Sequence, residues 1–251
     1  MPKKTSDLPP LDKLTVMLVG EPGHGKTVAA ASFPGPVLIL DIDRRVRPVQ
    51  LMYPDRTDIY YEQFNFQDGW IRFENFVNGL ENRSDYKTIV LDSLTSLARM
   101  AVNYHLAERN PKSVGTTKIK TPDWPEWKFE DRAVMAVLSH LRNNCGADFF
   151  IVNAHLQEYE RTVINKETQQ EEQKKYRRIV TGMKYLAAEL PAYFDEIYFI
   201  ERDSAKVRCF TRPQGDTLAK TALALPKMMD ITAPNTLFAE ISKALKLEAK
   251  K

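Results

Sequence analysis

Four short apolar runs recur along the first 152 residues, and segments of a different pattern separate them. The runs are Leu14–Val19, Val37–Leu40, Thr88–Leu91 and Phe149–Val152. Each run is continuous and rich in large or β-branched side chains, which is typical of strands that are buried on both faces of a parallel sheet. The pattern therefore predicts parallel strands at these four places.

The segments between the runs favour helices. We predict helices at Thr27–Ser32, Trp70–Asn82 and Glu126–Asn144. In the third segment the apolar residues recur on one helical face. These residues are Val134, Val137, Leu138 and Leu141. Strands that alternate with helices imply right-handed crossovers and an α/β fold, in which helices flank a mostly parallel central sheet.

The last third of the chain has a different pattern. Residues 194–202 and 205–214 alternate between apolar and polar side chains, as an antiparallel hairpin does, with residues 203–205 as its turn. A closing helix is expected at Asn235–Leu247. We interpret residues 1–12 as a disordered lead-in and residues 13–247 as one domain.

Composition narrows the class of protein. The chain has 251 residues, of which 43% are hydrophobic and 27% charged, as in ordinary soluble proteins. A net charge of +3 is too small to indicate nucleic-acid binding by itself. The basic N-terminus has no apolar core behind it, so we do not interpret it as a secretory signal. Cys145 and Cys209 lie far apart in sequence, which favours reduced thiols in a cytoplasm over a zinc site.

A glycine-rich loop joins the first predicted strand to the first predicted helix. The spacing Gly20-x-x-x-x-Gly25-Lys26-Thr27 is that of a phosphate-binding P-loop. In such a loop the backbone amides surround a polyphosphate, and the lysine adds a positive charge while the hydroxyl binds magnesium. The residues expected to bind the nucleotide are Gly20, Glu21, Pro22, Gly23, His24, Gly25, Lys26, Thr27 and Val28. A plain glycine-rich turn between strand and helix is the alternative.

Polar residues follow the other three strands. Asp92 comes directly after Thr88–Leu91 and is the expected magnesium carboxylate, although such a residue can also cap the next helix. Asp41 and Asp43 are two residues apart, so in an extended chain they point the same way, and one of them could activate the attacking water. They could equally be solvated carboxylates, balanced by the two arginines that follow them.

The fourth strand also ends in polar residues. Asn153 and His155 would reach the phosphate crevice at the carboxyl ends of the strands. They are therefore candidates for sensing the γ-phosphate. A structural role for the histidine is the alternative.

Taken in order, these motifs resemble the core of the RecA-like ATPases. More specifically, the chain resembles the short phage-encoded RecA-like ATPases that act as single-strand annealing proteins. The segments that carry the resemblance are VGEPGHGKT (19–27), PVLILDID (36–43), YKTIVLDSLTSL (86–97), IVNAH (151–155), LPAYFDEIYFIER (190–202) and TRPQGDTLAKT (211–221).

The resemblance implies roles for individual residues. It assigns ATP and Mg²⁺ to Lys26, Thr27 and Asp92. Asp43 would stand where these enzymes place a catalytic acid that is normally glutamate. His155 would stand at the switch position that is glutamine in recombinases.

The resemblance also implies assembly. Lys220, and less surely Arg212, would reach into a neighbouring subunit's site, so we expect a homo-oligomer, either a ring or a filament, with ATP between subunits.

Two segments are candidates for binding single-stranded DNA. Residues 116–128 combine cations with aromatic rings, a combination that suits phosphates and stacked bases. Their members are Lys118, Lys120, Trp124, Trp127 and Lys128. Residues 157–184 look like a flexible loop with a cationic end at Lys174, Lys175, Arg177 and Arg178. The alternative for residues 116–128 is a lid whose tryptophans pack on the domain. The alternative for residues 157–184 is a solvated loop that does not bind DNA.

The leading hypothesis is therefore an ATPase that binds single-stranded DNA and promotes annealing or strand pairing in phage recombination. A bacterial host cytoplasm and a host single-stranded DNA-binding protein as partner are implied by the resemblance alone. A small-molecule kinase and a nucleotide switch or helicase loader that never pairs DNA remain as alternatives.

Overall fold

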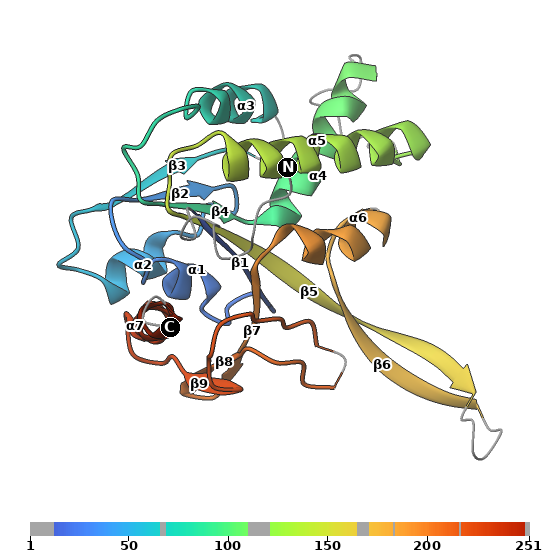
Figure 1. The fold of residues 1–251 in the computed structure, drawn as a ribbon. Coiled ribbons are helices and arrows are strands. Elements are labelled where there is room, and N and C mark those ends of the chain that lie inside the picture. The colour runs from blue at the N-terminus through green and yellow to red at the C-terminus, as the bar shows by residue number, and fades with distance from the viewer. Residues whose placement is uncertain are drawn as a thin grey trace, which may run out of the picture.

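The computed structural model describes residues 13–65, 69–109, 121–164, 171–182, 184–215 and 217–248. A mixed β-sheet forms the centre of this part of the chain, with strand order β3-β2-β4-β5-β1-β7-β8-β9 and β6 paired to β5 alone (Figure 1). The strands are β1 (Leu14–Gly20), β2 (Val37–Asp41), β3 (Ile59–Gln63), β4 (Thr88–Asp92), β5 (Phe149–Ile164), β6 (Glu171–Ile179), β7 (Glu196–Asp203), β8 (Lys206–Phe210) and β9 (Met228–Asp230).

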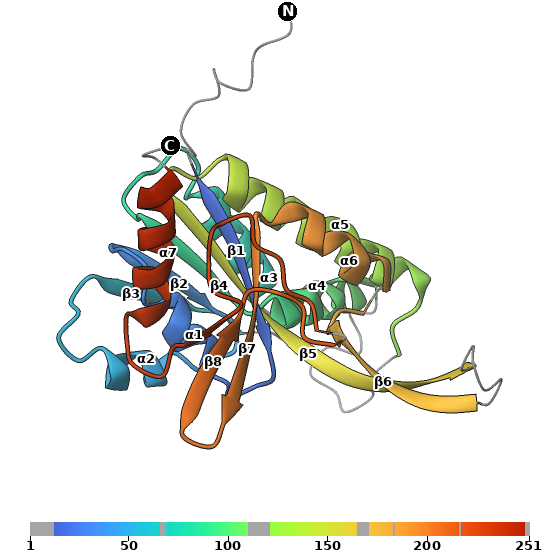
Figure 2. The ribbon, with the colours of Figure 1, turned by 60° about the horizontal axis from the view of Figure 1, so that its bottom comes forward.

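Helices cover both faces of the sheet. They are α1 (Lys26–Ala30), α2 (Arg47–Met52), α3 (Trp70–Asn78), α4 (Leu94–Arg109), α5 (Trp124–Asn143), α6 (Lys184–Glu189) and α7 (Thr236–Glu248), with a 3₁₀ turn at Leu190–Tyr193. The helices α3, α4 and α5 lie on one face, and α1, α2 and α7 lie on the other (Figures 1 and 2).

Alternation within the central strands builds two separate cores. Met17 and Val19 of β1 pack into the core under α3, α4 and α5, whereas Val16 and Leu18 pack into the core under α1, α2 and α7. Because each strand contributes to both cores, its run of apolar residues is unbroken. The four predicted strands are confirmed, each reaching at least one residue further than expected.

Strand register places the polar strand ends together. The parallel pairings set Gly20 beside His155, Asn153 beside Asp92, and Asp92 beside Asp41. Gly20, Asp41 and Asp92 end their strands, and Asn153 and His155 lie where the parallel pairing of β5 ends, so all are at the edge at which α/β sheets bind ligands. The fold thus brings four distant sequence segments to one edge.

All three helices predicted between the apolar runs have different bounds in the structure: α1 covers Lys26–Ala30 instead of Thr27–Ser32, and the shifts at α3 and α5 coincide with local features. The helix α3 stops at Asn78, and Gly79 follows as its C-cap residue. The helix α5 begins at Trp124, because the Asp123 carboxylate accepts from the amide of Trp124 and the Glu126 carboxylate accepts from the amide of Asp123.

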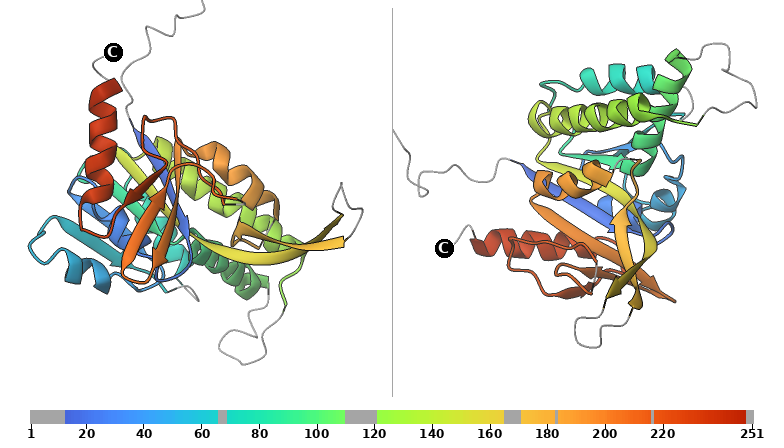
Figure 3. Two further views of the ribbon diagram at one scale, coloured as in Figure 1. Left: turned by 90° about the horizontal axis from the view of Figure 1, so that it is seen from below. Right: turned by 90° about the vertical axis from the view of Figure 1, so that its right-hand side faces the viewer.

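The prediction of a flexible loop at 157–184 is wrong for the residues that the structure describes there. The far part of β5 pairs with β6 from Leu156↔Ile179 to Ile164↔Glu171, and this two-stranded ribbon projects from the body of the protein (Figures 1 and 3). Cross-strand pairs of opposite charge and a stacked tyrosine pair support it. Charged and polar residues outnumber apolar ones in both paired segments, so they lack the apolar run that predicted the other strands.

The C-terminal predictions hold with small shifts. The strands β7 and β8 form the expected antiparallel hairpin, β9 adds a third strand beside β8, and α7 is the closing helix. Within the described ranges, none of the helices is long and apolar enough to cross a membrane. The thiols of Cys145 and Cys209 are both buried and unpaired.

Candidate functional site

The loop between β1 and α1 has the backbone that its glycines predict. Gly23 and Gly25 adopt left-handed conformations with φ of 83° and 90°. Gly20 is needed for close approach, because a Cβ there would lie 2.3 Å from the carbonyl oxygen of Ile200. The loop borders a cavity of about 330 Å³, which we call the phosphate cavity. Its lining includes Pro22, Gly23, Gly25, Lys26, Thr27, Val28, Asp43, Asp92 and His155.

Lys26 is buried at the base of this cavity. Its Nζ atom donates to the carbonyl oxygens of Gly20 at 2.8 Å and Glu21 at 2.9 Å, and lies 3.2 Å from Nδ1 of His155. Burial lowers the pKa of Lys26 to about 8, against the attraction of Asp92 and Asp43. The ammonium is therefore held by groups that a triphosphate would replace.

Thr27 and Asp92 form the expected hydroxyl–carboxylate pair. The Thr27 Oγ1 donates to Asp92 Oδ2 at 2.8 Å, and Asn153 donates to Asp92 Oδ1 at 3.0 Å. Complete burial raises the pKa of Asp92, although both hydrogen bonds act to lower it. This donor set suits Mg²⁺ that arrives with phosphates, since Mg²⁺ is usually held by one or two protein oxygens plus phosphate and water.

The part of the chain that the structure describes contains no cluster of three His, Cys, Asp or Glu residues that could hold a metal alone. The Oδ1 atom of Asn153 is buried without a hydrogen-bond partner there, directly behind the carboxylate. Thr27 and Asp92 therefore fit a nucleotide-borne ion better than a metal site built from protein alone.

Asp43 and His155 face each other across the cavity. The Nε2 atom of His155 lies 3.1 Å from Asp43 Oδ2, and Ser93 and Ser96 donate to Asp43 Oδ1. Burial raises the pKa of Asp43, but the hydrogen bonds from His155 and Ser96 outweigh it and hold that pKa below its usual value. Asp43 is therefore an ionised acceptor beside the phosphate loop.

The two candidate aspartates do not point the same way. Asp41 is fully buried and accepts from the amides of Arg45 and Val46 and from Gln63 Nε2. The strand β2 ends at Asp41, so the extended geometry on which the expectation rested stops there. Asp41 thus shapes the turn before α2, and Asp43 alone faces the cavity.

Two further expectations need correction. Asn153 is completely buried behind Asp92 and does not reach the phosphate crevice. Neither Arg44 nor Arg45 forms an ion pair with the aspartates among the described residues, because amides and hydroxyls already satisfy those carboxylates. Of the remaining loop residues, His24 lies 3.4 Å from the carbonyl oxygen of Ile200 and 3.9 Å from the Glu21 carboxylate.

Lys220 lies outside its own chain's phosphate cavity. Its backbone pairs with Ile197 near the start of β7, and its Nζ donates to the carbonyl oxygens of Phe194 at 2.7 Å and Pro191 at 3.3 Å. Arg212 is exposed, and its guanidinium lies 3.4 Å from the carbonyl oxygen of Thr221. Action of either residue in a neighbouring subunit stays a prediction.

The residues expected to bind DNA fall in several places. Lys118 and Lys120 lie outside the described residues. Trp124 is 60% exposed in the first turn of α5, near Lys128, whereas Trp127 packs against Gly182. Both tryptophans thus lie on the helix α5, where Trp124 is exposed and Trp127 is partly buried.

The cationic end of residues 157–184 lies on β6, which carries Lys174 and Lys175 as well as two arginines. The guanidinium of Arg178 lies over the exposed ring of Tyr159 at 5.2 Å, and Arg177 lies 3.8 Å from the Glu158 carboxylate. Both guanidinium groups thus lie over aromatic rings, Arg178 over Tyr159 and Arg177 over Phe199 at 5.5 Å, and Arg177 is in addition paired with an acid.

Sequence reasoning missed several residues of the site. Arg45 and Arg202 line the phosphate cavity, and Ser96 holds Asp43. The run of hydroxyl residues directly after Asp92 was a usable signal for Ser96. No sequence signal pointed to Arg202, because it comes from the hairpin strand β7, which is distant in sequence from the phosphate loop.

A second cavity of about 200 Å³ adjoins the first and shares Gly25, Val28, Pro48 and Arg202 with it. Its other walls include Tyr53 and residues 231–237, so it is large and apolar enough to receive the base end of a nucleotide.

Comparison with known proteins agrees with this geometry. The family model AAA_24, described as an AAA domain, matches residues 12–233. The chain belongs to this family. No curated protein matches the chain. Among solved structures, the crystal structure of the flagellar accessory protein FlaH from Methanocaldococcus jannaschii is similar, with 9% identity, a TM-score of 0.38, and 86% of this chain and 84% of that chain covered.

Membership of this AAA family identifies a P-loop nucleotide-binding domain of the NTPase type, which typically binds its nucleotide with Mg²⁺. The expected fold class is confirmed: an α/β P-loop core of RecA-like type, with a mostly parallel sheet and antiparallel C-terminal strands.

Proposed function

We propose that this AAA-family protein is an ATPase that binds single-stranded DNA and promotes strand annealing or pairing. The observation that carries the proposal is the position of His155. Its ring lies between Lys26 and Asp43 in the phosphate cavity, and its carbonyl oxygen accepts from the amide of Val180, directly after β6. One residue thus joins the nucleotide site to the base of the ribbon.

Hydrolysis follows from the groups around the cavity. A triphosphate in the loop would replace the carbonyl oxygens that now hold Lys26, and Mg²⁺ bound with it would neutralise charge on the phosphoryl oxygens. Asp43 is ionised and accepts hydrogen bonds, so it is suited to orient a water and take its proton. Arg45 and Arg202 line the cavity and would stabilise the transferred charge.

The ribbon supplies a surface that suits DNA. Tyr159 and Tyr176 stack with ring centroids 5.7 Å apart, and Arg178 lies over Tyr159. The register sets Arg161 opposite Lys174 two residues further along, so two more basic positions follow the tyrosines. Aromatic rings beside cations are the combination with which proteins bind single strands without sequence preference.

Coupling between the two regions follows from their contacts. Nδ1 of His155 lies within reach of the Lys26 ammonium, so it accepts, and Nε2 then carries the proton toward Asp43. A γ-phosphate that draws Lys26 away would remove one of these contacts and bias the position of His155. The strand β5 would transmit the change in the position of His155 to the ribbon. By reciprocity, DNA bound to the ribbon would alter the position of His155.

The test is ATP turnover with and without a single-stranded oligonucleotide, together with annealing of complementary oligonucleotides. We expect strand-stimulated turnover and faster annealing, and Lys26→Ala should lose both. Binding to DNA without pairing would favour a nucleotide switch or loader. Phosphate transfer to a small acceptor, with no strand binding, would favour a kinase.

Assembly is tested in the same samples by light scattering with a non-hydrolysable ATP analogue. The proposal expects a ring or filament of this chain on the strand. A monomer that turns over ATP at full rate at every dilution would contradict that part of it.

A further inference from the structure

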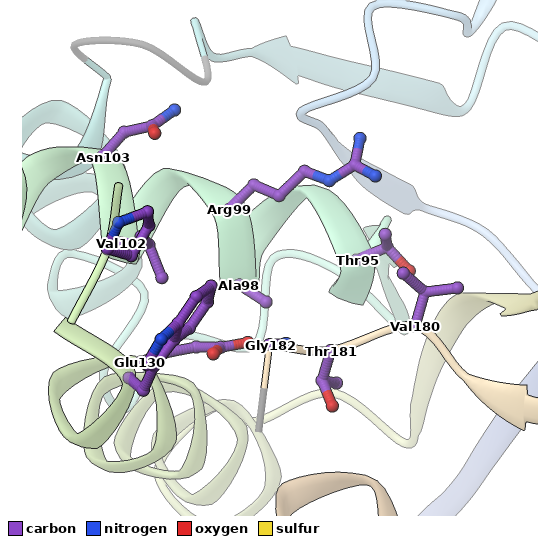
Figure 4. A pocket seen from close by; sticks show the side chains of 11 residues that line it. Thr95, Ala98, Arg99, Val102, Asn103, Glu130, Val180, Thr181 and Gly182 are labelled. Atoms are coloured by element: carbon purple, nitrogen blue, oxygen red, sulfur yellow. Dashed lines mark hydrogen bonds between the residues drawn. The ribbon is translucent and has the colours of Figure 1, made fainter. Parts of the chain in front are cut away.

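Two more cavities continue from the phosphate cavity along α4. The first, of about 550 Å³, shares Pro22, Asp43, Arg45 and His155 with the phosphate cavity, and we call it the arginine cavity. The second, of about 380 Å³, shares Thr95, Arg99 and Val180 with the arginine cavity, and we call it the indole cavity after Trp127 in its wall (Figure 4). The three cavities adjoin one another in series.

The arginine cavity has an excess of positive charge. Arg44, Arg45 and Arg99 line it and are exposed, and within the described ranges none of their guanidinium groups has a carboxylate partner. Arg44 adopts a left-handed backbone conformation with φ of 56°, which costs free energy for a residue with a side chain. Asp43 is the carboxylate in this cavity, and His155 and Ser96 already engage it. An anion would satisfy the three cations.

The indole cavity has a different chemistry. Its walls include the side chains of Ala98 and Val102 from α4, Trp127 from α5, and Val180 after β6. The backbone of Gly182 lies against the indole, where a Cβ would be 2.1 Å from a ring atom, and its amide donates to Glu130 at 2.7 Å. The cavity thus combines a flat aromatic surface, apolar walls and a few polar groups, which suits a planar heterocycle.

Arg99 connects the two cavities. In Figure 4 its side chain extends from α4 toward the side on which Thr95 and Val180 lie. It is the cation common to both linings. A ligand with an anionic group beside a planar group would therefore place the junction of the two at Arg99.

The same cavities border the main chain of His155. The amide of His155 donates to Thr95 Oγ1 at 3.2 Å, and its carbonyl oxygen accepts from the amide of Val180 at 2.9 Å. Thr95 and Val180 line both the arginine cavity and the indole cavity. A ligand there would contact both groups that hold His155 in place.

We propose that one nucleotide unit of a single strand binds across these cavities, with its phosphate at Arg99 and its base against Trp127. This inference rests on the proposed function and deepens it by assigning a strand-binding site beside the ATPase centre. Unpaired guanidinium groups favour a phosphodiester, and the indole favours a base as its neighbour. The bound unit fixes Thr95 and Val180, and through them His155, so that strand binding promotes hydrolysis.

The first experiment measures the affinity for a single-stranded oligonucleotide against salt concentration. Arg99→Gln removes the shared cation, and Arg132→Gln removes an exposed arginine of α5 that borders none of these cavities. We expect Arg99→Gln to weaken binding about tenfold and to reduce the salt slope by about one phosphate contact. Arg99→Lys should restore most of the slope, and Arg132→Gln should resemble the parent.

The second experiment tests the base. Trp127→Leu is compared with the parent on a normal oligonucleotide and on one that carries only abasic sites. We expect the substitution to weaken binding about tenfold on the normal strand and to have little effect on the abasic strand. Circular dichroism of the variant checks folding, and Arg99→Gln keeps the proposal testable if Trp127→Leu does not fold.

The outcomes separate the two proposals. If the parent binds no single strand at all, the proposed function and this site both fail. If the parent binds but Arg99→Gln has the parent's affinity and salt slope, only this site fails. An equal loss by Trp127→Leu on normal and abasic strands would overturn the base contact. Competition by an acidic peptide but not by an abasic strand would assign the cavities to a protein partner instead.

Discussion

The Nε2 atom of His155 lies 3.1 Å from Oδ2 of Asp43, and the opposite ring nitrogen lies 3.2 Å from Nζ of Lys26. The imidazole therefore links the carboxylate proposed to activate water with the ammonium proposed to bind the phosphate. Asp43→Asn should lower kcat for ATP about 10²- to 10⁴-fold with little change in nucleotide affinity, because it removes a proton acceptor and no phosphate contact. Single-turnover kinetics and a fluorescent-nucleotide titration measure the two quantities.

The variant His155→Ala tests whether His155 couples strand binding to ATP turnover or takes part in proton transfer itself. It should retain measurable basal turnover but lose stimulation by single strands, because Asp43 keeps its contacts with Ser93 and Ser96. Full strand stimulation in this variant would contradict the linking role.

Nucleotide affinity should depend on pH through Lys26. Its pKa in the free protein is lowered to about 8 by burial, and a bound triphosphate would raise it. The positive charge of Lys26 is therefore fully present below pH 8 in the free protein and is lost as the pH rises above 8. Nucleotide affinity should then fall about tenfold per pH unit. Isothermal titration of nucleotide between pH 6.5 and 10 measures this. Lys26→Arg does not titrate in that range and should give a flat profile, and a flat parent profile would exclude the mechanism.

The dependence of nucleotide affinity on Mg²⁺ should change when Asn153 is replaced, although Asn153 does not line the phosphate cavity. Its amide donates to Asp92, and removing that donor by Asn153→Ala should raise the already elevated pKa of Asp92 further. Mg²⁺ requires the ionised carboxylate, so the loss of Mg²⁺-dependent nucleotide affinity on acidification should begin at a higher pH than in the parent. Asp92→Asn should lose the Mg²⁺ dependence at every pH, and identical acid profiles for Asn153→Ala and the parent would count against this arrangement.

Two adjacent arginines on the ribbon should differ in their effect on DNA binding. Arg178 lies over Tyr159, whereas Arg177 is already paired with Glu158 and also lies over Phe199. We expect Arg178→Gln to reduce strand affinity and the salt slope by about one phosphate contact, and Arg177→Gln to have the smaller effect. Fluorescence anisotropy at several salt concentrations measures both, and a larger loss for Arg177→Gln would contradict the proposal that Arg178 is the arginine that contacts DNA.

Lys220 offers a test of action between subunits. Its ammonium holds the carbonyl oxygens of Phe194 and Pro191, so Lys220→Met should lower stability by about 1 kcal/mol. If Lys220 also acts in a neighbouring site, Lys220→Met should reduce ATP turnover by more than its loss of stability explains. Mixing Lys220→Met subunits with Asp43→Asn subunits should then restore part of the activity. Normal turnover in the folded variant would leave Lys220 with a structural role alone.

Much of the nucleotide site was readable in the sequence because its chemistry is local. The spacing from Gly20 to Thr27 specifies a loop whose backbone conformation depends on the glycines within it. The apolar run before Asp92 likewise predicted a buried strand with a carboxylate at its end, which is where the structure has it. Neighbours in sequence determine these features, so a pattern suffices.

Other features of the fold and the site could not be predicted from the sequence, because they depend on pairing between distant segments. Two aspartates in LDID looked equivalent, and only the end of β2 and the contacts of Gln63 and His155 separate their roles. The ribbon looked like a charged loop, because the pairing of β5 with β6 that makes it a ribbon is not visible in either segment alone. Arg99 gave no signal as an isolated residue of a helix.

The sequence by itself therefore determined that this chain is an α/β protein with a phosphate loop, its lysine and hydroxyl, and a carboxylate to accompany them. Only the tertiary structure decided which aspartate faces the cavity, that Asn153 lies behind Asp92, and that two further cavities follow α4 from the phosphate cavity to Trp127. The reason is physical: backbone conformation responds to adjacent residues, whereas cavities and charge environments arise where strand register brings remote side chains together.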